Sequence, residues 1–259
     1  MPIPGGLLIA LEGIDGTGKS TQAALLRDWL AGLGLEVLAT KEPTGGPWGK
    51  KIRDSAISGR MAPQDELDAF VADRKAHVRD EIVPALRRGA AVVIDRYYYS
   101  TVAYQGARGL PKAEVLAANR AFAPIPDVVF LFDLEPEAGL DRVTGRGQGK
   151  DLFETVDELS KARENFRWLA RTNQHVVQLD AAQAPGEVQR ALLSALVRGP
   201  LLARLPGLAA SLTVPVANPA YALLALAVEL SADPAMLPQE RARRLWCAAQ
   251  VSGSPSPAG

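Results

Sequence analysis

One stretch of the chain limits its fold more than any other: Gly13-Ile14-Asp15-Gly16-Thr17-Gly18-Lys19-Ser20, which is followed by Thr21. It fits the pattern G-x-x-x-x-G-K-[ST], a glycine-rich loop that surrounds phosphate groups with backbone N–H groups. An apolar run at residues 7–11 leads into the loop as a short buried strand, and apolar residues recur at helical spacing over 19–33. Because the first N–H groups of a helix have no partner within it, a helix that begins at this loop favours an anion. The stretch predicts binding of a nucleoside triphosphate, the alternative being a glycine-rich turn before an ordinary helix.

Strand and helix patterns alternate up to about residue 198. The expected strands are short runs rich in Val, Ile and Leu, at residues 7–11, 36–40, 91–95, 128–134 and 175–179. Continuous apolar runs separated by helices are typical of a parallel sheet that helices cover on both faces. With right-handed crossovers, this predicts a three-layer α/β fold around a five-stranded parallel sheet. Ligands of such sheets bind at the carboxyl ends of the strands, so residues 13–20, residues 41–46 and the pair Asp95-Arg96 should surround one crevice.

The composition narrows the class of partner. The 259 residues include 29 basic and 29 acidic side chains, so no diffuse nucleic-acid or membrane footprint is expected. A single cysteine, Cys247, excludes a disulfide within the chain and fits a reducing compartment. The N-terminus lacks the charged region and cleavage pattern of a signal peptide, and no segment approaches the roughly 18 apolar residues of a membrane span. We therefore expect a cytoplasmic protein with no nucleic-acid or membrane partner.

The chain changes character near Gly199-Pro200. Residues 199–259 hold eight of the 19 prolines but only seven charged residues, against 51 in the preceding 198 residues. Two short helices are expected there, at 220–230 and at 238–250, and the last residues, 252–259, are expected to form a disordered tail. The sequence thus divides into a domain at 1–198 and an apolar, proline-rich extension at 199–259.

The phosphate loop also predicts a metal site. Lys19 should reach the β- and γ-phosphates, and the Ser20 hydroxyl should ligate Mg²⁺. Asp95 ends the run Ala91-Val92-Val93-Ile94, where a carboxylate can face the same metal from the next strand; a polar residue at such a place can also simply mark a turn. Arg96 follows directly, and its guanidinium offers two parallel hydrogen bonds to phosphate oxygens.

Four motifs, in order along the chain, resemble those of thymidylate kinases. They are LEGIDGTGKST at 11–21, KEPTGG at 41–46, FVADRKAH at 70–77, and DRY at 95–97 with STVAYQG at 100–106. The resemblance covers about residues 7–197. It implies a P-loop nucleoside monophosphate kinase fold, ATP-dependent phosphorylation of dTMP to dTDP, a Mg²⁺ ion bound with ATP, and a homodimer.

The resemblance assigns residues to two nucleotides. ATP is expected at Gly13, Ile14, Asp15, Gly16, Thr17, Gly18, Lys19, Ser20, Thr21, Arg142 and Arg146. dTMP is expected at Asp15, Glu42, Pro43, Phe70, Arg74, Arg96, Thr101, Tyr104 and Gln105.

Within this assignment each pocket residue has a role. Phe70 stacks on thymine and Arg74, four residues later on the same helix face, donates to its O4, although alone they would suggest a core ring and a solvated charge. Gln105, assisted by Thr101, suits the imide edge of the base because an amide can donate and accept. Tyr104 lies against the deoxyribose, and Asp15 approaches the 3′-hydroxyl.

The catalytic cation is expected on a lid. One branch of the family has an arginine directly after the loop aspartate, where this chain has Gly16. The glycine-rich, basic segment at about 142–153 resembles the mobile lid of the bacterial branch. Arg146 should therefore join Lys19, Arg96 and Asp15 in catalysis. Arg142 and Lys150 are the alternative lid cations, and a solvated loop is the alternative to a lid.

Two positions depart from the family pattern. Leu152 stands where the bacterial lid often has another arginine, and Lys41 replaces an arginine at an expected contact with the dTMP phosphate. No nucleophilic side chain is needed, because the acceptor phosphate oxygen is already ionised. His77 is accordingly expected on a helix surface and His175 at the start of a strand.

Two other functions stay open from the sequence. A deoxynucleoside kinase shares the Asp95-Arg96 pair but phosphorylates a 5′-hydroxyl and needs a general base, for which Glu42 is the candidate. A nucleotide-binding protein with weakened catalysis would instead use residues 199–259 to bind a partner. The motifs do not separate dTMP from dUMP as the acceptor.

Overall fold

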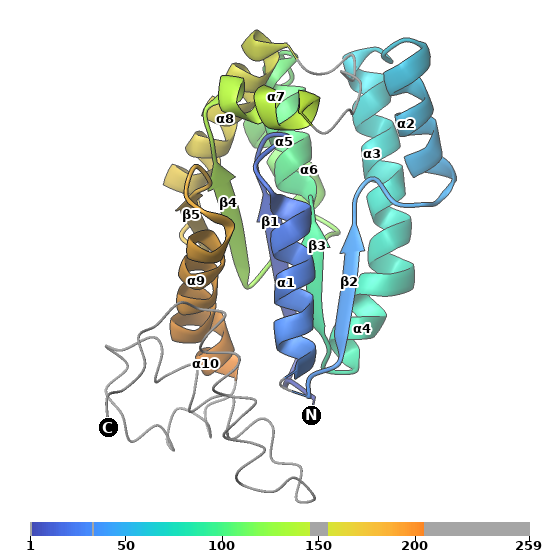
Figure 1. Ribbon diagram of the computed structural model, residues 1–259. Helices are drawn as coiled ribbons and strands as arrows, with labels where there is room; N and C mark the ends of the chain where they lie inside the picture. Colours follow the sequence, from blue (N-terminus) through green and yellow to red (C-terminus); the bar gives the residue numbers. More distant parts are fainter. Residues whose placement is uncertain (1, 33, 146–154, 205–259) are drawn as a thin grey trace, which may run out of the picture.

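Five parallel strands lie side by side in the order β2-β3-β1-β4-β5 (Figure 1). The computed structural model describes residues 2–32, 34–145 and 155–204. The strands are β1 (Leu7–Glu12), β2 (Val37–Lys41), β3 (Ala91–Asp95), β4 (Val128–Asp133) and β5 (Val176–Asp180). Each lies within one residue of its predicted bounds, and every pairing is parallel. The predicted five-stranded parallel sheet is confirmed.

Helices connect the strands and cover both faces of the sheet (Figure 1). They are α1 (Lys19–Gly32), α2 (Pro47–Ser58), α3 (Pro63–His77), α4 (Val83–Arg87), α5 (Tyr98–Ala107), α6 (Lys112–Arg120), α7 (Pro136–Thr144), α8 (Val156–Thr172), α9 (Pro185–Leu196) and α10 (Leu202–Arg204). A short π-helical turn, η1 (Val78–Ile82), joins α3 to α4, and the segment η2 (Val197–Leu201), which is kinked at Gly199, joins α9 to α10. The three-layer α/β fold expected from the sequence is therefore the one observed.

Alternation of side chains along the strands divides the core in two. From β1, Leu7, Ile9 and Leu11 pack with residues of α1 and α9. From the same strand, Leu8 and Ala10 pack with residues of α5 and α8 on the other face. Because both faces are buried, the central strands are apolar at successive positions.

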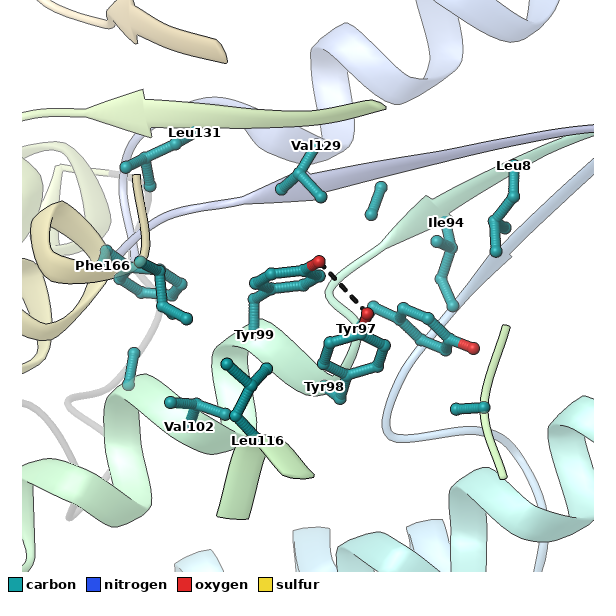
Figure 2. Close-up of a cluster of buried hydrophobic side chains, with 14 of the residues drawn as sticks. Leu8, Ile94, Tyr97, Tyr98, Tyr99, Val102, Leu116, Val129, Leu131 and Phe166 are labelled. Carbon is teal, nitrogen blue, oxygen red and sulfur yellow. Dashed lines mark hydrogen bonds between the residues drawn. The ribbon is translucent and has the colours of Figure 1, made fainter. Parts of the chain in front are cut away.

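Three consecutive tyrosines anchor the start of α5 in the second core (Figure 2). Tyr97, Tyr98 and Tyr99 are at most 1% exposed, and the rings of Tyr98 and Tyr99 stack with centroids 4.4 Å apart. The Tyr98 hydroxyl donates to the Tyr99 hydroxyl at 3.1 Å, and the latter contacts the ring of His175, directly before β5. This packing fixes the start of α5, which directly follows the turn that carries Arg96.

The packed part of the chain continues past the predicted boundary at residue 198. Leu201 is 0% exposed, and Arg204 pairs with Asp127, whose other carboxylate oxygen accepts the Leu8 N–H at 2.8 Å. The expected helices at 220–230 and 238–250, the expected tail and residues 146–153 of the expected lid lie outside the described residues. The division into a domain and an extension stays a prediction. In residues 2–32, 34–145 and 155–204, no helix has the length and apolar character needed to cross a membrane.

The position of a truncation should therefore matter. A chain that ends after Arg204 keeps all of the contacts described above and serves as the reference. Ending the chain after Arg198 removes the Leu201 side chain and the ion pair of Arg204, at an expected cost of about 2–4 kcal/mol in the free energy of unfolding. Urea unfolding of both truncated chains measures the difference. Equal stability of the two truncated chains would contradict this expectation.

Candidate active site

The phosphate loop is the turn between β1 and α1, and its shape depends on glycine. Gly13, Gly16 and Gly18 have φ angles of 142°, 80° and 88°. A β-carbon on Gly16 would lie 2.2 Å from the carbonyl oxygen of Gly139 in α7, so no side chain fits there. Residues 13–21, which are expected to contact ATP, thus form this turn and the N-terminus of α1. With α7 so close, the loop has no room for the arginine that one branch of the family carries.

Lys19 lies folded over the loop. Its ammonium donates to the carbonyl oxygen of Ile14 at 2.7 Å and to the hydroxyl of Thr17 at 3.2 Å, and the residue is 5% exposed. Burial, together with the charge of Arg96, lowers the pKa of Lys19 to about 8. The ammonium is still mostly protonated at neutral pH, so it can exchange these neutral acceptors for phosphate oxygens.

Ser20 and Asp95 form the pair expected to hold a metal. Ser20 Oγ donates to Asp95 Oδ2 at 2.5 Å, and Asp95 Oδ1 is buried with no hydrogen-bond partner in the described part of the chain. Hydroxyl and carboxylate oxygens suit Mg²⁺, which takes few protein ligands and completes its shell with water and phosphate oxygens. The unpaired Oδ1 therefore fits a role as a metal ligand.

Arg96 contacts both the phosphate loop and the start of α5. Its φ angle is 67°, in the left-handed region that side chains rarely adopt. The guanidinium donates to the Gly13 carbonyl and to Ser100 Oγ, both at 3.2 Å, and forms an ion pair with Asp15. The Tyr104 ring lies 5.4 Å from the Arg96 guanidinium carbon, and the Tyr104 hydroxyl donates to Asp15 Oδ2 at 3.3 Å. Burial alone would raise the pKa of Asp15, but attraction to Arg96 lowers it to about 2, so this carboxylate is ionised at neutral pH.

A buried carboxylate holds α5 against the loop. Glu12 is 0% exposed and accepts the backbone N–H groups of Tyr97 at 2.8 Å and Ser100 at 3.2 Å, and the Ser100 hydroxyl at 2.6 Å. N–H groups at the start of a helix lack partners within it, so Glu12 caps α5 from the end of β1. Burial raises the pKa of Glu12 to about 7, and these hydrogen bonds oppose the rise. Ser100 also accepts from Arg96, so Glu12 helps to orient that arginine.

A cavity of about 240 Å³ lies beside the phosphate loop. It is lined by Asp15, Glu42, Pro43, Ile52, Arg53, Ala56, Arg60, Glu66, Phe70, Arg74, Arg96, Tyr97, Ser100, Thr101, Tyr104 and Gln105. All nine residues expected at dTMP are among them, although they come from segments far apart in the sequence. The structure therefore brings these residues together, and their contacts with a nucleotide stay predictions.

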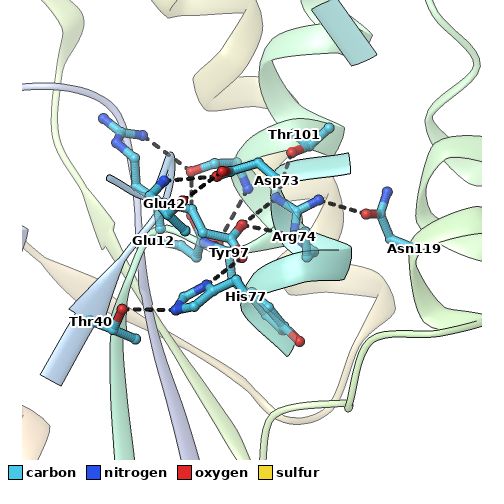
Figure 3. Close-up of polar contacts among 12 residues, drawn as sticks. Glu12, Thr40, Glu42, Asp73, Arg74, His77, Tyr97, Thr101 and Asn119 are labelled. Atoms are coloured by element: carbon cyan, nitrogen blue, oxygen red, sulfur yellow. Dashed lines mark hydrogen bonds and ion pairs between the residues drawn. The ribbon is translucent and has the colours of Figure 1, made fainter. Parts of the chain in front are cut away.

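Arg74 lines the cavity, and several hydrogen bonds hold its side chain in place (Figure 3). It is 1% exposed, and its Nε and Nη2 donate to Glu42 Oε2 at 2.8 and 2.5 Å. Nη2 also donates to Thr101 Oγ1 at 3.0 Å, and Nη1 donates to Asn119 Oδ1 at 2.6 Å. Arg74 thus joins α3 to the segment after β2, to α5 and to α6, and these contacts fix its position in the cavity wall.

His77 does not lie on a helix surface, so that expectation is wrong. It is 3% exposed, with Nδ1 3.0 Å from Glu42 Oε1 and Nε2 2.8 Å from Thr40 Oγ1 (Figure 3). Because a carboxylate only accepts, Nδ1 is the donor to Glu42. Asp73, in the same motif, also binds the segment after β2. It accepts hydrogen bonds from the Thr44 N–H at 2.7 Å and from the Thr44 hydroxyl at 2.6 Å. The FVADRKAH motif thus ties α3 to the segment after β2.

Motif matching missed the charged wall residues Arg53, Arg60 and Glu66. Arg53, in α2, donates to the carbonyl oxygens of Pro43 at 3.1 Å and Thr44 at 2.7 Å. Lys41, by contrast, is exposed at the end of β2 and does not line the cavity, and its expected contact with the dTMP phosphate stays a prediction. The only sequence signal for Arg53 is a basic residue on a short helix after the KEPTGG motif, and such residues are usually solvated.

Among the expected lid cations, Arg142 lies in α7 beside the phosphate loop. Its Nη1 donates to the carbonyl oxygen of Ala181 at 3.0 Å and lies 3.5 Å from that of Gly16. Arg142 therefore contacts the phosphate loop and the segment that follows β5. Arg146 and Lys150 lie outside the described residues.

Asp15 belongs to the phosphate loop and also lines the cavity, and Arg96, a second cavity-lining residue, donates to Gly13 of the loop and pairs with Asp15. On a five-stranded parallel sheet this arrangement defines a P-loop protein of the nucleoside monophosphate kinase class. The thymidylate kinase family model matches residues 11–192, and the chain belongs to that family.

Several curated relatives carry the same name. The thymidylate kinase of Xylella fastidiosa strain M23 is 50% identical over 179 residues, which are 69% of this chain and 82% of the relative. The thymidylate kinase of Xanthomonas campestris pv. campestris strain B100 is 51% identical over 178 residues, 69% of this chain and 78% of the relative. The thymidylate kinase of Xanthomonas oryzae pv. oryzae strain PXO99A has the same identity and coverage.

Proposed function

We propose that this chain transfers the γ-phosphoryl group of ATP to dTMP and releases dTDP and ADP. The main observation behind the proposal is the cavity beside the phosphate loop. Asp15 and Arg96 line it next to the loop, and Phe70, Arg74 and Gln105 line it as well. An aromatic ring, a guanidinium and an amide suit a pyrimidine, which stacks on one face and forms hydrogen bonds along its edge. Relatives named thymidylate kinase, with half of the aligned residues identical, support the same acceptor.

The proposed reaction needs no nucleophilic side chain. A phosphate oxygen of dTMP forms a bond to the γ-phosphorus, the bond from that phosphorus to the β–γ bridging oxygen breaks, and ADP leaves with the oxygen. Lys19 would neutralise the β- and γ-phosphate oxygens, and Arg96 would hold the two nucleotides in line. Arg53 would bind the dTMP phosphate. The ionised Asp15 would accept a hydrogen bond from the sugar 3′-hydroxyl.

Several finer features belong to the same proposal. Ser20 and Asp95 would hold Mg²⁺ with the ATP phosphates, and when bound the ion neutralises charge on the transferring phosphoryl group. Arg146 would act from the lid. We also infer a homodimer and a cytoplasmic location, as the family resemblance and the single cysteine suggest. Removal of Mg²⁺ by EDTA and sedimentation of the purified chain test the first and third of these features.

The contacts of Glu42 disfavour a deoxynucleoside kinase. That activity needs Glu42 as a free base, yet Glu42 is 5% exposed and its two carboxylate oxygens accept from Arg74 and His77. Both oxygens of Glu42 are therefore already engaged by donors of the protein, and neither is left free to meet a sugar hydroxyl. Glu42 is thus better suited to hold Arg74 than to deprotonate a sugar hydroxyl.

An assay of ADP release across acceptors tests the proposal. The full chain with ATP and Mg²⁺ would be given dTMP, dUMP, dCMP, dAMP, dGMP or thymidine. We expect the highest kcat/KM with dTMP and no turnover of thymidine. Phosphorylation of thymidine alone would instead indicate a deoxynucleoside kinase. Binding of ATP and dTMP without turnover would indicate the protein with weakened catalysis.

Replacing Phe70 by alanine should weaken dTMP binding more than it slows the chemical step. Stacking of a base on an aromatic ring is worth about 1–3 kcal/mol, so we expect the KM for dTMP to rise by roughly 5- to 150-fold. Steady-state kinetics at saturating ATP would measure this, with kcat expected within about threefold of the parent. Phe70→Leu is the matched control, because it keeps an apolar side chain and loses only the ring. Unchanged dTMP affinity in Phe70→Ala would refute the stacking role.

A further inference from the structure

A buried carboxylate in the cavity wall has no part in the chemistry above. Glu66, in α3, is 1% exposed. Its Oε2 accepts from Gln105 Nε2 at 2.7 Å and from Arg108 Nη1 at 2.6 Å, and its Oε1 accepts from Arg60 Nε at 3.3 Å. Because the two guanidinium groups already balance the charge of Glu66, its contact with Gln105 is not needed for neutralisation.

The contact with Glu66 fixes which end of the Gln105 amide is free. An amide has an NH₂ group that donates and an oxygen that accepts, so an unrestrained glutamine can turn either toward a ligand. A carboxylate only accepts, and Glu66 therefore holds Nε2. Gln105 lines the cavity at 1% exposure, and its Oε1 is buried without a hydrogen-bond partner in residues 2–32, 34–145 and 155–204. Such an acceptor is unfavourable until a donor reaches it.

Pyrimidines differ at the edge that this oxygen would meet. A thymine-type base has an N3–H donor between two carbonyl groups, whereas a cytosine-type base has a bare N3 acceptor there. We propose that Glu66 is a positioning residue that turns the Gln105 oxygen toward an imide N–H and so makes the cavity select thymine-type over cytosine-type bases. This inference rests on the proposed function and adds a residue that acts on selectivity through another side chain.

If Glu66 served only to hold Arg60 in place, disturbing Arg60 from its other partner should have the same effect on base selectivity as changing Glu66. Arg60 also pairs with Glu158 of α8, at 2.9 Å from Glu158 Oε1, so Glu66 and Glu158 both hold this arginine. Glu158 does not line the cavity. Glu158→Gln is therefore a matched control that disturbs the same arginine and leaves the contact between Glu66 and Gln105 in place.

The test compares dTMP with 5-methyl-dCMP, which differ only at the N3 and C4 edge of the base. Calorimetry would give the Kd of each for the full chain, and the assay of ADP release would give kcat and KM. The parent chain should prefer dTMP by at least about 100-fold, since sites built around a hydrogen bond discriminate strongly. In Glu66→Gln we expect this preference to fall at least about tenfold, with kcat for dTMP within about threefold; Glu158→Gln should keep it. When Gln105 is already replaced by alanine, adding Glu66→Gln should change the preference for dTMP over 5-methyl-dCMP by less than about twofold.

Several results would overturn the inference. Equal affinity of the parent for both nucleotides, an unchanged preference in Glu66→Gln, or the same loss in the Gln105→Ala background would each do so. If Glu66→Gln fails to fold in a thermal melt, Glu66→Asp serves instead, because it withdraws the carboxylate from Gln105 while keeping its charge for the arginines. The Kd values are measured without turnover. A chain that binds dTMP but does not phosphorylate it would therefore refute the proposed function, while the ratio of the two Kd values would still test the role of Glu66.

Discussion

Replacing Lys19 by alanine is expected to lower kcat by about a hundred- to a thousandfold, the usual effect of removing one preorganised donor from a developing charge. The Lys19 ammonium lies inside the phosphate loop, 2.7 Å from the Ile14 carbonyl oxygen and 3.2 Å from the Thr17 hydroxyl. These acceptors are neutral, so a polyphosphate competes with them easily. Because the charge on the β- and γ-oxygens changes during transfer, the loss should be larger in kcat than in the KM for ATP.

Two further variants test whether the effect of Lys19→Ala comes from the loss of this particular charge. Lys19→Met keeps most of the buried volume without the charge, so its kcat should fall as far as that of Lys19→Ala. Lys161→Ala removes a lysine whose side chain is 57% exposed and pairs with Asp157 in α8, and it should leave kcat unchanged. Single-turnover measurements would separate the chemical step from product release. A Lys19→Met variant within fivefold of the parent kcat would contradict the proposed role.

The inner strands could be predicted more closely than the edge strands. β3 matches its predicted bounds, and β1 and β4 each differ at one end. The edge strands β2 and β5 are shifted by one residue at both ends. The physical reason is burial, because β3 has apolar neighbours on both faces and its apolar run marks the whole strand. β2 and β5 are partly exposed, so their hydrophobic runs do not mark their ends.

Predictions for the site depended on whether a residue belonged to a motif. Phe70 and Gln105 could be placed because each lies in a motif of the resemblance, and both line the cavity. Arg53 and Glu66 could not, because their positions depend on how α2 packs against α3 and how α3 packs against α5. His77 was misplaced for the same reason, since its partner Glu42 lies 35 residues earlier in the chain. The role of Arg146 stays a prediction.

Replacing Arg96 should have an effect comparable with that of Lys19, through a different mechanism. Arg96 contacts the loop at Gly13, the start of α5 at Ser100 and the carboxylate of Asp15 at the same time. An ammonium cannot form this set of contacts, because it lacks the planar fork of a guanidinium. We expect kcat to fall about 10- to 100-fold in Arg96→Lys and about 100- to 1000-fold in Arg96→Ala. Arg171→Ala is the control, since that side chain is 60% exposed and pairs with Glu164 of the same helix.

The pH dependence of Arg96→Ala distinguishes loss of a phosphate contact from loss of the partner of Asp15. In the parent the pKa of Asp15 is about 2, below its ordinary 3.8, so the stabilisation from ionised Asp15 is present above pH 3.8 and lost as the pH falls through about 2. Without Arg96, the burial that raises this pKa is opposed less strongly, and Asp15 should take up a proton at a higher pH. The acid limb of kcat/KM for dTMP should therefore move to higher pH in Arg96→Ala, but less in Arg96→Lys, which keeps a positive charge. An acid limb that is unchanged in both variants would mean that Arg96 acts on the phosphates without controlling the charge of Asp15.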